Sequence, residues 1–193
     1  MIGLIDYDAG NLFSVRRALE HVGASVRLVG KPSDMRGLDR VVLPGVGAFG
    51  AGIARLHETG LHDALMMHLH EEGALLGICL GMQLLCRTST ERGEHVGLGV
   101  FDAAVERLPD TGTVPHMGWN EVSGSGPVDG TMYAYFAHSY YISATADGVV
   151  ATSTHSVPVA AAMQRDRVWG VQFHPEKSGP AGLALLKRFA ETA

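Results

Sequence analysis

Residues 75–86 of the chain read LLGICLGMQLLC, and Cys79 stands at the centre of the segment Gly77-Ile78-Cys79-Leu80-Gly81. The apolar run 74–78 predicts a buried strand that continues directly into this turn and then into a helix. A sharp strand-to-helix turn needs small residues on both sides of its central residue, and it lifts the central side chain clear of the sheet. We therefore expect Cys79 at the carboxyl end of a strand and at the N-terminus of a helix.

A cysteine in this position is suited to be a nucleophile. The partial positive charge and free N–H groups of a helix N-terminus favour thiolate over thiol, and the Leu80 N–H can stabilise an oxyanion. An arbitrary cysteine is more often a small buried hydrophobe, but the two glycines and the strand-to-helix context favour a nucleophile here. Cys86, expected inside the following helix, is interpreted as packing.

A base and its orienting acid are predicted by Trp169-Gly170-Val171-Gln172-Phe173-His174-Pro175-Glu176. Pro175 biases His174 towards an extended conformation, in which residues two apart point the same way, so His174 and Glu176 can meet. A carboxylate on one imidazole nitrogen leaves the other nitrogen to exchange a proton with sulfur. On its own a His-Pro-Glu segment is typical of a surface strand end, whereas beside a nucleophile turn it indicates catalysis. His138 is a rival base, but no acid lies within two residues of it.

A second oxyanion donor is expected from the loop at 44–47, Pro-Gly-Val-Gly, which follows an apolar strand at 40–43. Its backbone N–H groups lie where ligands bind in open parallel sheets. Taken alone, the glycines could simply form a turn. The loop lacks the lysine and the Ser or Thr of a phosphate-binding loop.

The remaining pattern predicts the fold class. Strands at 1–5, 25–29, 40–43 and 74–78 alternate with a helix capped by Asn11 and ended by Gly23, and with helical segments that reach Glu72. After about residue 96 the chain becomes rich in strands, at 99–108, 131–143, 149–155 and a hairpin of 159–164 with 167–173, before a helix at 182–190. This order predicts an α/β protein: a single domain over 1–193 with a flavodoxin-like, open, mostly parallel sheet, helices on both faces, and a β-rich C-terminal half.

Composition excludes several classes of protein. Of the 193 residues 46% are hydrophobic and the net charge is -5, which excludes a disordered chain and gives no reason to expect nucleic acid. No apolar run approaches a membrane span and the start lacks a signal peptide, so we expect a cytoplasmic protein. Helical spacing would hold Cys79 and Cys86 too far apart for a disulfide, so both are expected to be free thiols. In the helical segments, His68 and His70 face different ways and His57 and His62 lack a partner four residues on, so neither a metal nor a cofactor is expected.

Together, GICLGMQ, HPE and PGVG make the chain similar to the class I, triad-type glutamine amidotransferases. More narrowly, residues 4–176 resemble the glutaminase subunit of imidazole glycerol phosphate synthase, from histidine biosynthesis. The segments that carry this narrower resemblance are DYDAGNLFSV, PGVGAFGAG, GICLGMQLL, VPHMGWN and FAHSYY.

The resemblance implies a role for each matching residue. The triad would be Cys79, His174 and Glu176, and the oxyanion hole would be Val46 or Gly47 together with Leu80. The glutamine-binding residues would be Gly47, Gln83, Ser139 and Tyr140. It also implies a heterodimer with a (βα)8-barrel cyclase that uses the ammonia, contacted near Asn11, His116, Met117, Gly118, Trp119 and Asn120.

Three other functions compete with this interpretation. The glutaminase component of an anthranilate or guanylate synthase would share the triad motifs, but not AGNLFS and PHMGWN. A cysteine-type α/β-hydrolase would share the turn, but there the acid precedes the histidine in the chain, whereas Glu176 follows His174. A catalytically dead binding subunit would not need the intact triad.

Overall fold

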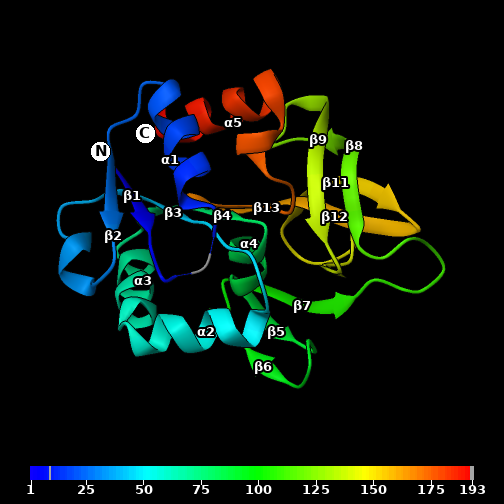
Figure 1. Ribbon diagram of the computed structural model, residues 1–193, viewed down its shortest axis with the longest axis horizontal. Coiled ribbons are helices and arrows are strands. Elements are labelled where there is room, and N and C mark those ends of the chain that lie inside the picture. Colours follow the sequence, from blue (N-terminus) through cyan, green and yellow to red (C-terminus); the bar gives the residue numbers. More distant parts are fainter. Residues whose placement is uncertain (9, 192–193) are drawn as a thin grey trace.

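The computed structural model describes residues 1–8 and 10–191 (Figure 1). Its first half contains β1 (Ile2–Ile5), α1 (Leu12–His21), β2 (Val26–Val29), the 3-10 turn η1 (Pro32–Met35), β3 (Arg40–Leu43), α2 (Phe49–Glu58), α3 (Leu61–His70), β4 (Ala74–Ile78) and α4 (Leu80–Leu84). Its second half contains β5 (Cys86–Ser89), β6 (His95–Val96), β7 (Phe101–Arg107), β8 (His116–Gly124), β9 (Gly130–His138), β10 (Tyr140–Tyr141), β11 (Val149–His155), β12 (Val157–Arg165), β13 (Val168–Val171), η2 (Pro175–Lys177) and α5 (Gly179–Glu191).

A nine-stranded sheet organises the molecule in the order β2-β1-β3-β4-β13-β12-β11-β8-β9. The first five strands run parallel to one another, with the order of a flavodoxin-like sheet. The remaining strands pair antiparallel and come from the C-terminal half of the chain. The α/β class is confirmed, and the β-rich half extends the parallel sheet. Because β13 lies beside β4, the residues after both strands reach the same edge.

Helices cover both faces of the parallel half. Figure 1 shows α1 and α5 above the sheet and α2, α3 and α4 below it. Leu19 and Phe189 are buried in the upper layer, whereas Leu56 and Leu65 are buried in the lower one. Helix α1 begins as predicted, since the Asn11 side chain accepts a hydrogen bond from the Ser14 N–H at 3.2 Å. Among the described residues, no helix combines the length and apolar character needed to cross a bilayer.

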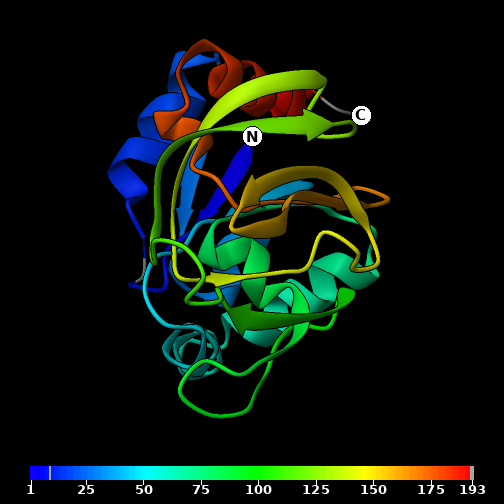
Figure 2. The same ribbon diagram turned by 90° about the vertical axis from the view of Figure 1, so that its right-hand side faces the viewer.

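A smaller four-stranded sheet, β10-β7-β5-β6, lies on the same side as α2 and α4 (Figures 1 and 2). Its formation corrects the prediction for Cys86, which begins β5 rather than lying inside a helix. The carbonyls of Leu84, Leu85 and Cys86 accept hydrogen bonds from the N–H groups of residues 98, 101 and 99. Helix α4 therefore ends at Leu84, because the later loop takes the carbonyls that another turn would have used.

The predicted strand at 131–143 is divided between the two sheets. β9 ends at His138 in the large sheet, and β10 begins at Tyr140 in the small one. Ser139 therefore marks the point where the chain crosses between the sheets. Strand β8, which pairs with β9, is not predicted from the sequence. Glycines and polar residues interrupt the alternation of apolar and polar residues along it. The hairpin of β12 and β13 is confirmed.

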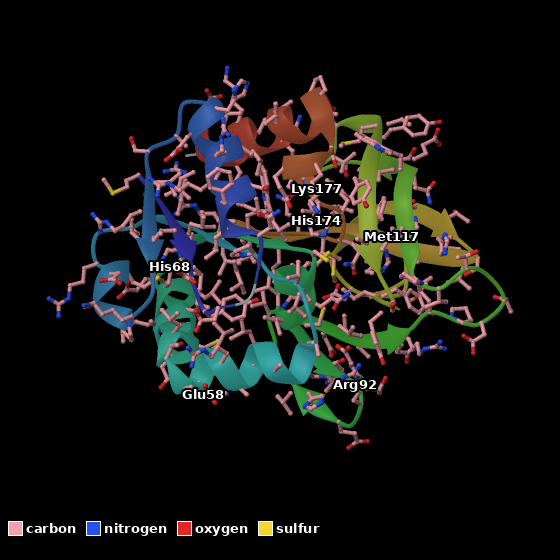
Figure 3. All side chains as sticks on the ribbon, in the orientation of Figure 1. Glu58, His68, Arg92, Met117, His174 and Lys177 are labelled. Carbon is pink, nitrogen blue, oxygen red and sulfur yellow. The ribbon has the colours of Figure 1, made fainter. Side chains whose placement is uncertain are left out.

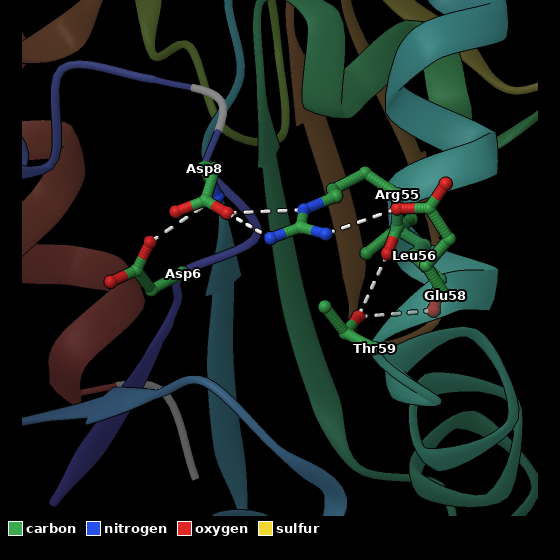
Figure 4. A network of polar contacts seen from close by, with 6 residues as sticks. All are labelled: Asp6, Asp8, Arg55, Leu56, Glu58 and Thr59. Atoms are coloured by element: carbon green, nitrogen blue, oxygen red, sulfur yellow. Dashed lines mark hydrogen bonds and ion pairs between the residues drawn. The ribbon is translucent and has the colours of Figure 1, made fainter.

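An ion-pair network links Asp8, which follows β1, to helix α2 (Figure 4). Arg55 of α2 donates hydrogen bonds from its guanidinium group to the Asp8 carboxylate, and from Nη1 to Glu58 at 3.0 Å. Thr59 closes the same helix end by donating to the Arg55 carbonyl at 2.9 Å. The network joins the first loop of the sheet edge to α2, the helix that follows the 44–47 loop.

Candidate active site

Cys79 occupies the turn between β4 and α4. Its backbone has φ 54° and ψ -108°, a conformation that L-residues rarely adopt. The Cys79 N–H donates to the Val171 carbonyl at 2.8 Å, and its own carbonyl accepts from the Gln83 N–H at 3.2 Å. The strand on one side and the helix on the other therefore hold the strained residue in place. Its side chain is 6% exposed, at the wall of a cavity.

The two flanking glycines are required by close backbone contacts. A Cβ on Gly81 would lie 1.9 Å from the Leu43 carbonyl oxygen, and one on Gly77 would lie 2.8 Å from the backbone of Gly81. Such contacts cannot be relieved by rotating a side chain. The turn can therefore form only with glycine at both positions, as the sequence pattern predicts.

His174 lies beside both Cys79 and Glu176. Its Nδ1 atom is 2.9 Å from Glu176 Oε1, with the two side chains 5% and 1% exposed. The His174 N–H donates to the Tyr135 carbonyl at 2.9 Å. The Cys79 side chain is the other polar group that acts on the charge of the ring. The structure thus brings together the three residues that the sequence predicts as a triad.

The two acidic neighbours of His174 control its charge. Burial by itself lowers the pKa of His174, but the hydrogen bonds to Cys79 and Glu176 and their negative charges outweigh it and raise the pKa to about 9. His174 is therefore protonated at neutral pH and lies between the Cys79 side chain and the Glu176 carboxyl group. A cysteine beside a protonated histidine is the arrangement expected of a nucleophile with its proton donor.

A cavity of about 400 Å³ opens beside Cys79. Its walls include every residue expected at the oxyanion hole and the glutamine site: Val46, Gly47, Leu80, Gln83, Ser139 and Tyr140. Three charged residues that sequence reasoning missed, Glu91, Arg92 and Arg107, line it as well. They come from the small sheet and its loops. Local sequence patterns do not predict that this sheet lies beside the cavity. Figure 3 shows Arg92 and one further lining residue, Met117, on different sides of His174.

Tyr7 anchors the loop at 44–47, and the sequence pattern did not reveal this role. Its hydroxyl donates to the Pro44 carbonyl at 2.8 Å, and the side chain is 1% exposed. Burial, together with the negative charge of Cys79, raises the pKa of Tyr7, so the hydroxyl keeps its proton. The anchored loop then presents Gly47, with φ 104°, at the cavity.

His138, the rival base, does not face an acid. Its Nδ1 atom is 2.8 Å from the Tyr140 carbonyl oxygen. Burial lowers the pKa of His138 to about 4, an effect to which the charges of His155 and His174 add. It is therefore neutral at pH 7, and its ring is already engaged in hydrogen bonds, so His174 is the stronger candidate for the base.

The residues expected near a partner differ in exposure. Met117 and Trp119 are 65% and 58% exposed on β8, and Asn11 caps α1. His116, in contrast, is 3% exposed, and its ring stacks on Phe136 and His155. Within residues 1–8 and 10–191, no group of three or more His, Cys, Asp or Glu side chains is arranged to hold a metal ion.

The sequence profile of the family described as "Glutamine amidotransferase class-I" matches residues 3–193. The chain belongs to this family. "Imidazole glycerol phosphate synthase subunit HisH" of Desulfitobacterium hafniense is 42% identical over 198 residues, which cover 99% of this chain and 94% of that protein. The protein of the same name from Moorella thermoacetica is 43% identical over 197 residues, with coverage of 98% and 94%. A solved structure, "Crystal structure of glutamine amidotransferase", superposes with a TM-score of 0.79 at 22% identity and covers 98% of this chain and 97% of that one.

Membership of this family confirms the fold class and the kind of enzyme that the sequence predicts. A glutamine amidotransferase hydrolyses glutamine and supplies the ammonia. The α/β-hydrolase alternative is set aside, because the acid that contacts His174 is Glu176, two residues later in the chain.

Proposed function

We propose that the chain is the glutaminase subunit of an imidazole glycerol phosphate synthase in histidine biosynthesis, with Cys79, His174 and Glu176 as its triad. The observation that carries the proposal is the position of His174, which is hydrogen-bonded to Glu176 and interacts with Cys79 at the 400 Å³ cavity that Cys79 lines. The similarity to subunits of that name over nearly the whole chain supports the choice of synthase.

The reaction follows from this geometry. The Cys79 thiolate attacks the side-chain carboxamide carbon of L-glutamine, and backbone N–H groups of Leu80 and of Val46 or Gly47 stabilise the oxyanion. His174 protonates the nitrogen as the C–N bond breaks, which releases ammonia and leaves a thioester. His174 then takes a proton from water, whose oxygen displaces the sulfur and releases glutamate. Glu176 keeps the ring oriented throughout.

Glutamine would be held by groups that line the cavity. Gly47, Gln83, Ser139 and Tyr140 line it and are proposed to position the carboxamide and the main chain of the amino acid. The α-ammonium and α-carboxylate of glutamine carry opposite charges, which suit the carboxylate of Glu91 and the guanidinium groups of Arg92 and Arg107.

The ammonia would pass to a cyclase subunit of (βα)8-barrel fold in a heterodimer. The exposed side chains of Met117 and Trp119 support an interface on β8, near the cavity that Met117 lines. Phe13, which is 70% exposed two residues after Asn11, is a separate exposed apolar side chain on α1. The buried His116 would take part only through its neighbour Asn120. A cytoplasmic location belongs to the same proposal and is supported by the two free cysteines.

The partner would also complete the oxyanion hole. Val46 is 47% exposed and Gly47 adopts a positive φ, so the peptide between them can rotate with little steric cost. We expect this peptide to change orientation when the cyclase binds. Crystal structures with and without the partner that show one unchanged Val46 peptide would contradict this part of the proposal.

The proposal is tested by measuring glutamine-dependent ammonia release with the candidate cyclase and its ribonucleotide substrate present or absent. The native chain should release ammonia faster in the complete mixture, and Cys79→Ala should release none above background. Undiminished release by Cys79→Ala refutes the nucleophile. Native activity that is indifferent to the cyclase points instead to another synthase, such as that for anthranilate or guanylate.

A further inference from the structure

A buried glutamine contacts the sulfur of Cys79. Gln172 has no exposed surface, and its Nε2 atom lies 3.8 Å from Cys79 Sγ. Its Oε1 atom accepts a hydrogen bond from Gln83 Nε2 at 2.9 Å. Gln83 Nε2 also donates to the Tyr140 carbonyl at 2.9 Å. Three amide groups thus lead from the nucleophile to the wall of the cavity.

A second set of hydrogen bonds leads from the same Tyr140 carbonyl to two buried histidines. It accepts from His138 Nδ1 at 2.8 Å, and His138 Nε2 lies 3.0 Å from His116 Nδ1. His116 Nε2 lies 3.1 Å from Asn120 Nδ2. The complete series, from Asn120 through His116, His138, Tyr140, Gln83 and Gln172 to Cys79, is called the amide-imidazole relay below.

Only one arrangement of protons satisfies this relay. A carbonyl can only accept, so His138 Nδ1 carries the hydrogen and its Nε2 accepts from His116 Nδ1–H. His116 Nε2 must then accept from the Asn120 amide. The orientation of that amide is fixed independently, because Asn120 Oδ1 accepts from the Glu121 N–H at 2.8 Å and Nδ2 donates to the Thr154 carbonyl at 2.9 Å.

The same logic fixes the end of the relay at the sulfur. Gln83 donates from Nε2 to two acceptors, the Tyr140 carbonyl and Gln172 Oε1. Gln172 must therefore turn its N–H₂ group towards Cys79. A thiolate that is 6% exposed has lost most of its water, and an aimed N–H group replaces part of that solvation.

We propose that Gln172 is a further catalytic residue, which donates to the Cys79 sulfur, and that His138 and His116 are positioning residues that keep it oriented through Tyr140 and Gln83. The inference rests on the proposed function, since it gives Gln172 a task only if Cys79 is the nucleophile. His174 gives up its proton to the leaving ammonia, whereas the amide of Gln172 does not titrate. Gln172 therefore contacts the sulfur in every step of the reaction.

The first test substitutes Gln172 and measures the activity of the variant chain in complex with the proposed cyclase. Gln172→Met keeps the volume and removes both polar atoms, and Gln164→Met, on the neighbouring strand β12, is the matched control. We expect kcat for glutaminase to fall by about tenfold to 100-fold in Gln172→Met, with a smaller change in KM. Alkylation of Cys79 by iodoacetamide, measured at one neutral pH for all variants, should slow as well.

Interference from the second cysteine is not expected in the alkylation assay. Cys86 has no exposed surface, and burial raises the pKa of its thiol to about 12. Gln164→Met should behave like the native protein in both assays. Native kcat and native alkylation in a folded Gln172→Met protein would overturn the inference while leaving the proposed function intact.

A second variant separates the contact to sulfur from a structural role. Gln172→Glu keeps an acceptor for Gln83 and places a carboxylate oxygen where the N–H₂ group faced Cys79. A residue needed only to hold Gln83 would leave alkylation unchanged, which contradicts the inference. A donor to the thiolate predicts slower alkylation, and this comparison remains usable if Gln172→Met does not fold.

The histidines are tested by a matched pair. His116→Phe keeps the ring that stacks between Phe136 and His155, but it removes both nitrogen contacts of the relay. His155→Phe alters the other ring of the stack, whose Nε2 lies 2.6 Å from the Thr113 carbonyl, outside the relay. We expect lower kcat and slower alkylation in His116→Phe alone. Equal effects of the two substitutions, or none, would remove the histidines from the proposal.

Discussion

At the scale of single residues, the turn at Cys79 could be predicted because its requirements are local. Two glycines, a preceding apolar strand and a following helix are all visible within a few positions, and the structure adds the atoms that exclude a Cβ. Tyr7 and Gln172 could not be predicted in the same way. Their partners, Pro44 and Cys79, lie far away in the sequence, and only the folded sheet brings them together.

Gly81→Ala should destabilise the protein and displace Cys79. The added Cβ would lie 1.9 Å from the Leu43 carbonyl oxygen, so strand β3 or the turn must move, at a cost of about 3 kcal/mol or more. Gly30→Ala is the control, since no atom lies within 4 Å of its added Cβ. Urea unfolding measures both variants, and equal stability for the two would contradict the role of Gly81.

The charge on His174 predicts a loss of stability at alkaline pH. Its pKa is raised to about 9 in the folded protein, whereas an unfolded histidine titrates near 6.5. The favourable contribution is therefore complete below about pH 6.5 and is lost as the pH rises through about 9, by up to about 3 kcal/mol. Urea unfolding of the native protein and Glu176→Gln across this range should show a smaller loss in the variant. Identical pH profiles would show that Glu176 does not hold the charge.

At the scale of elements, predictions succeeded where the chain forms continuous apolar strands or capped helices. They failed where elements depend on distant pairing. β8 forms because it pairs with β9 along its length, from His116 opposite His138 to Gly124 opposite Gly130. Helix α4 stops early because a later loop takes its carbonyls. The same hairpin of β8 and β9 places two buried histidines side by side.

The two buried histidines, His116 and His138, should make the stability of the protein sensitive to acid. Burial, with the charges of neighbouring histidines, lowers the pKa of His116 to about 3, and burial lowers that of His138 to about 4. In the unfolded chain both bind protons near pH 6.5, so the free energy of unfolding should fall as the pH drops from about 6.5 towards 4. His155, on β11, and His174 are the other titratable groups that face them.

His116→Phe should flatten this decline, because one of the two groups that resist protonation is removed. The measurement is the midpoint of urea unfolding between pH 7 and 4.5, chosen as roughly the span between the unfolded and folded pKa values. His62→Phe, a half-buried histidine on α3 far from the hairpin, is the control. A decline as steep in His116→Phe as in the native protein would contradict the assignment.

At the scale of the whole molecule, the proposed active site lies where two sheets meet. The parallel half supplies Cys79 and His174 at one edge, and the small sheet and the crossing at Ser139 provide the opposite wall of the cavity. The sequence predicts the first contribution, since parallel strands share an edge. The sequence does not predict that Glu91, Arg92 and Arg107 line the cavity. The placement of β5 to β7 depends on contacts between the two sheets.

We expect the partner to bind at the surface of β8 formed by Met117 and Trp119. Trp119→Glu should weaken association with the proposed cyclase partner by about tenfold or more, because a few aromatic residues often contribute much of the binding energy of an interface. Leu28→Glu, at an exposed apolar position on β2 at the other edge of the sheet, should have no effect. Titration calorimetry measures both, and equal affinities for Trp119→Glu and the native chain would exclude this surface.

The central claim is that Cys79 forms a covalent thioester with the γ-carbonyl of glutamine. The most direct measurement is acid quenching of the complete complex during turnover of radiolabelled glutamine, followed by detection of label bound to the chain. Native protein and Cys86→Ala should both carry the label, and Cys79→Ala should carry none. Label retained in Cys79→Ala, or lost in a folded Cys86→Ala, would contradict the account.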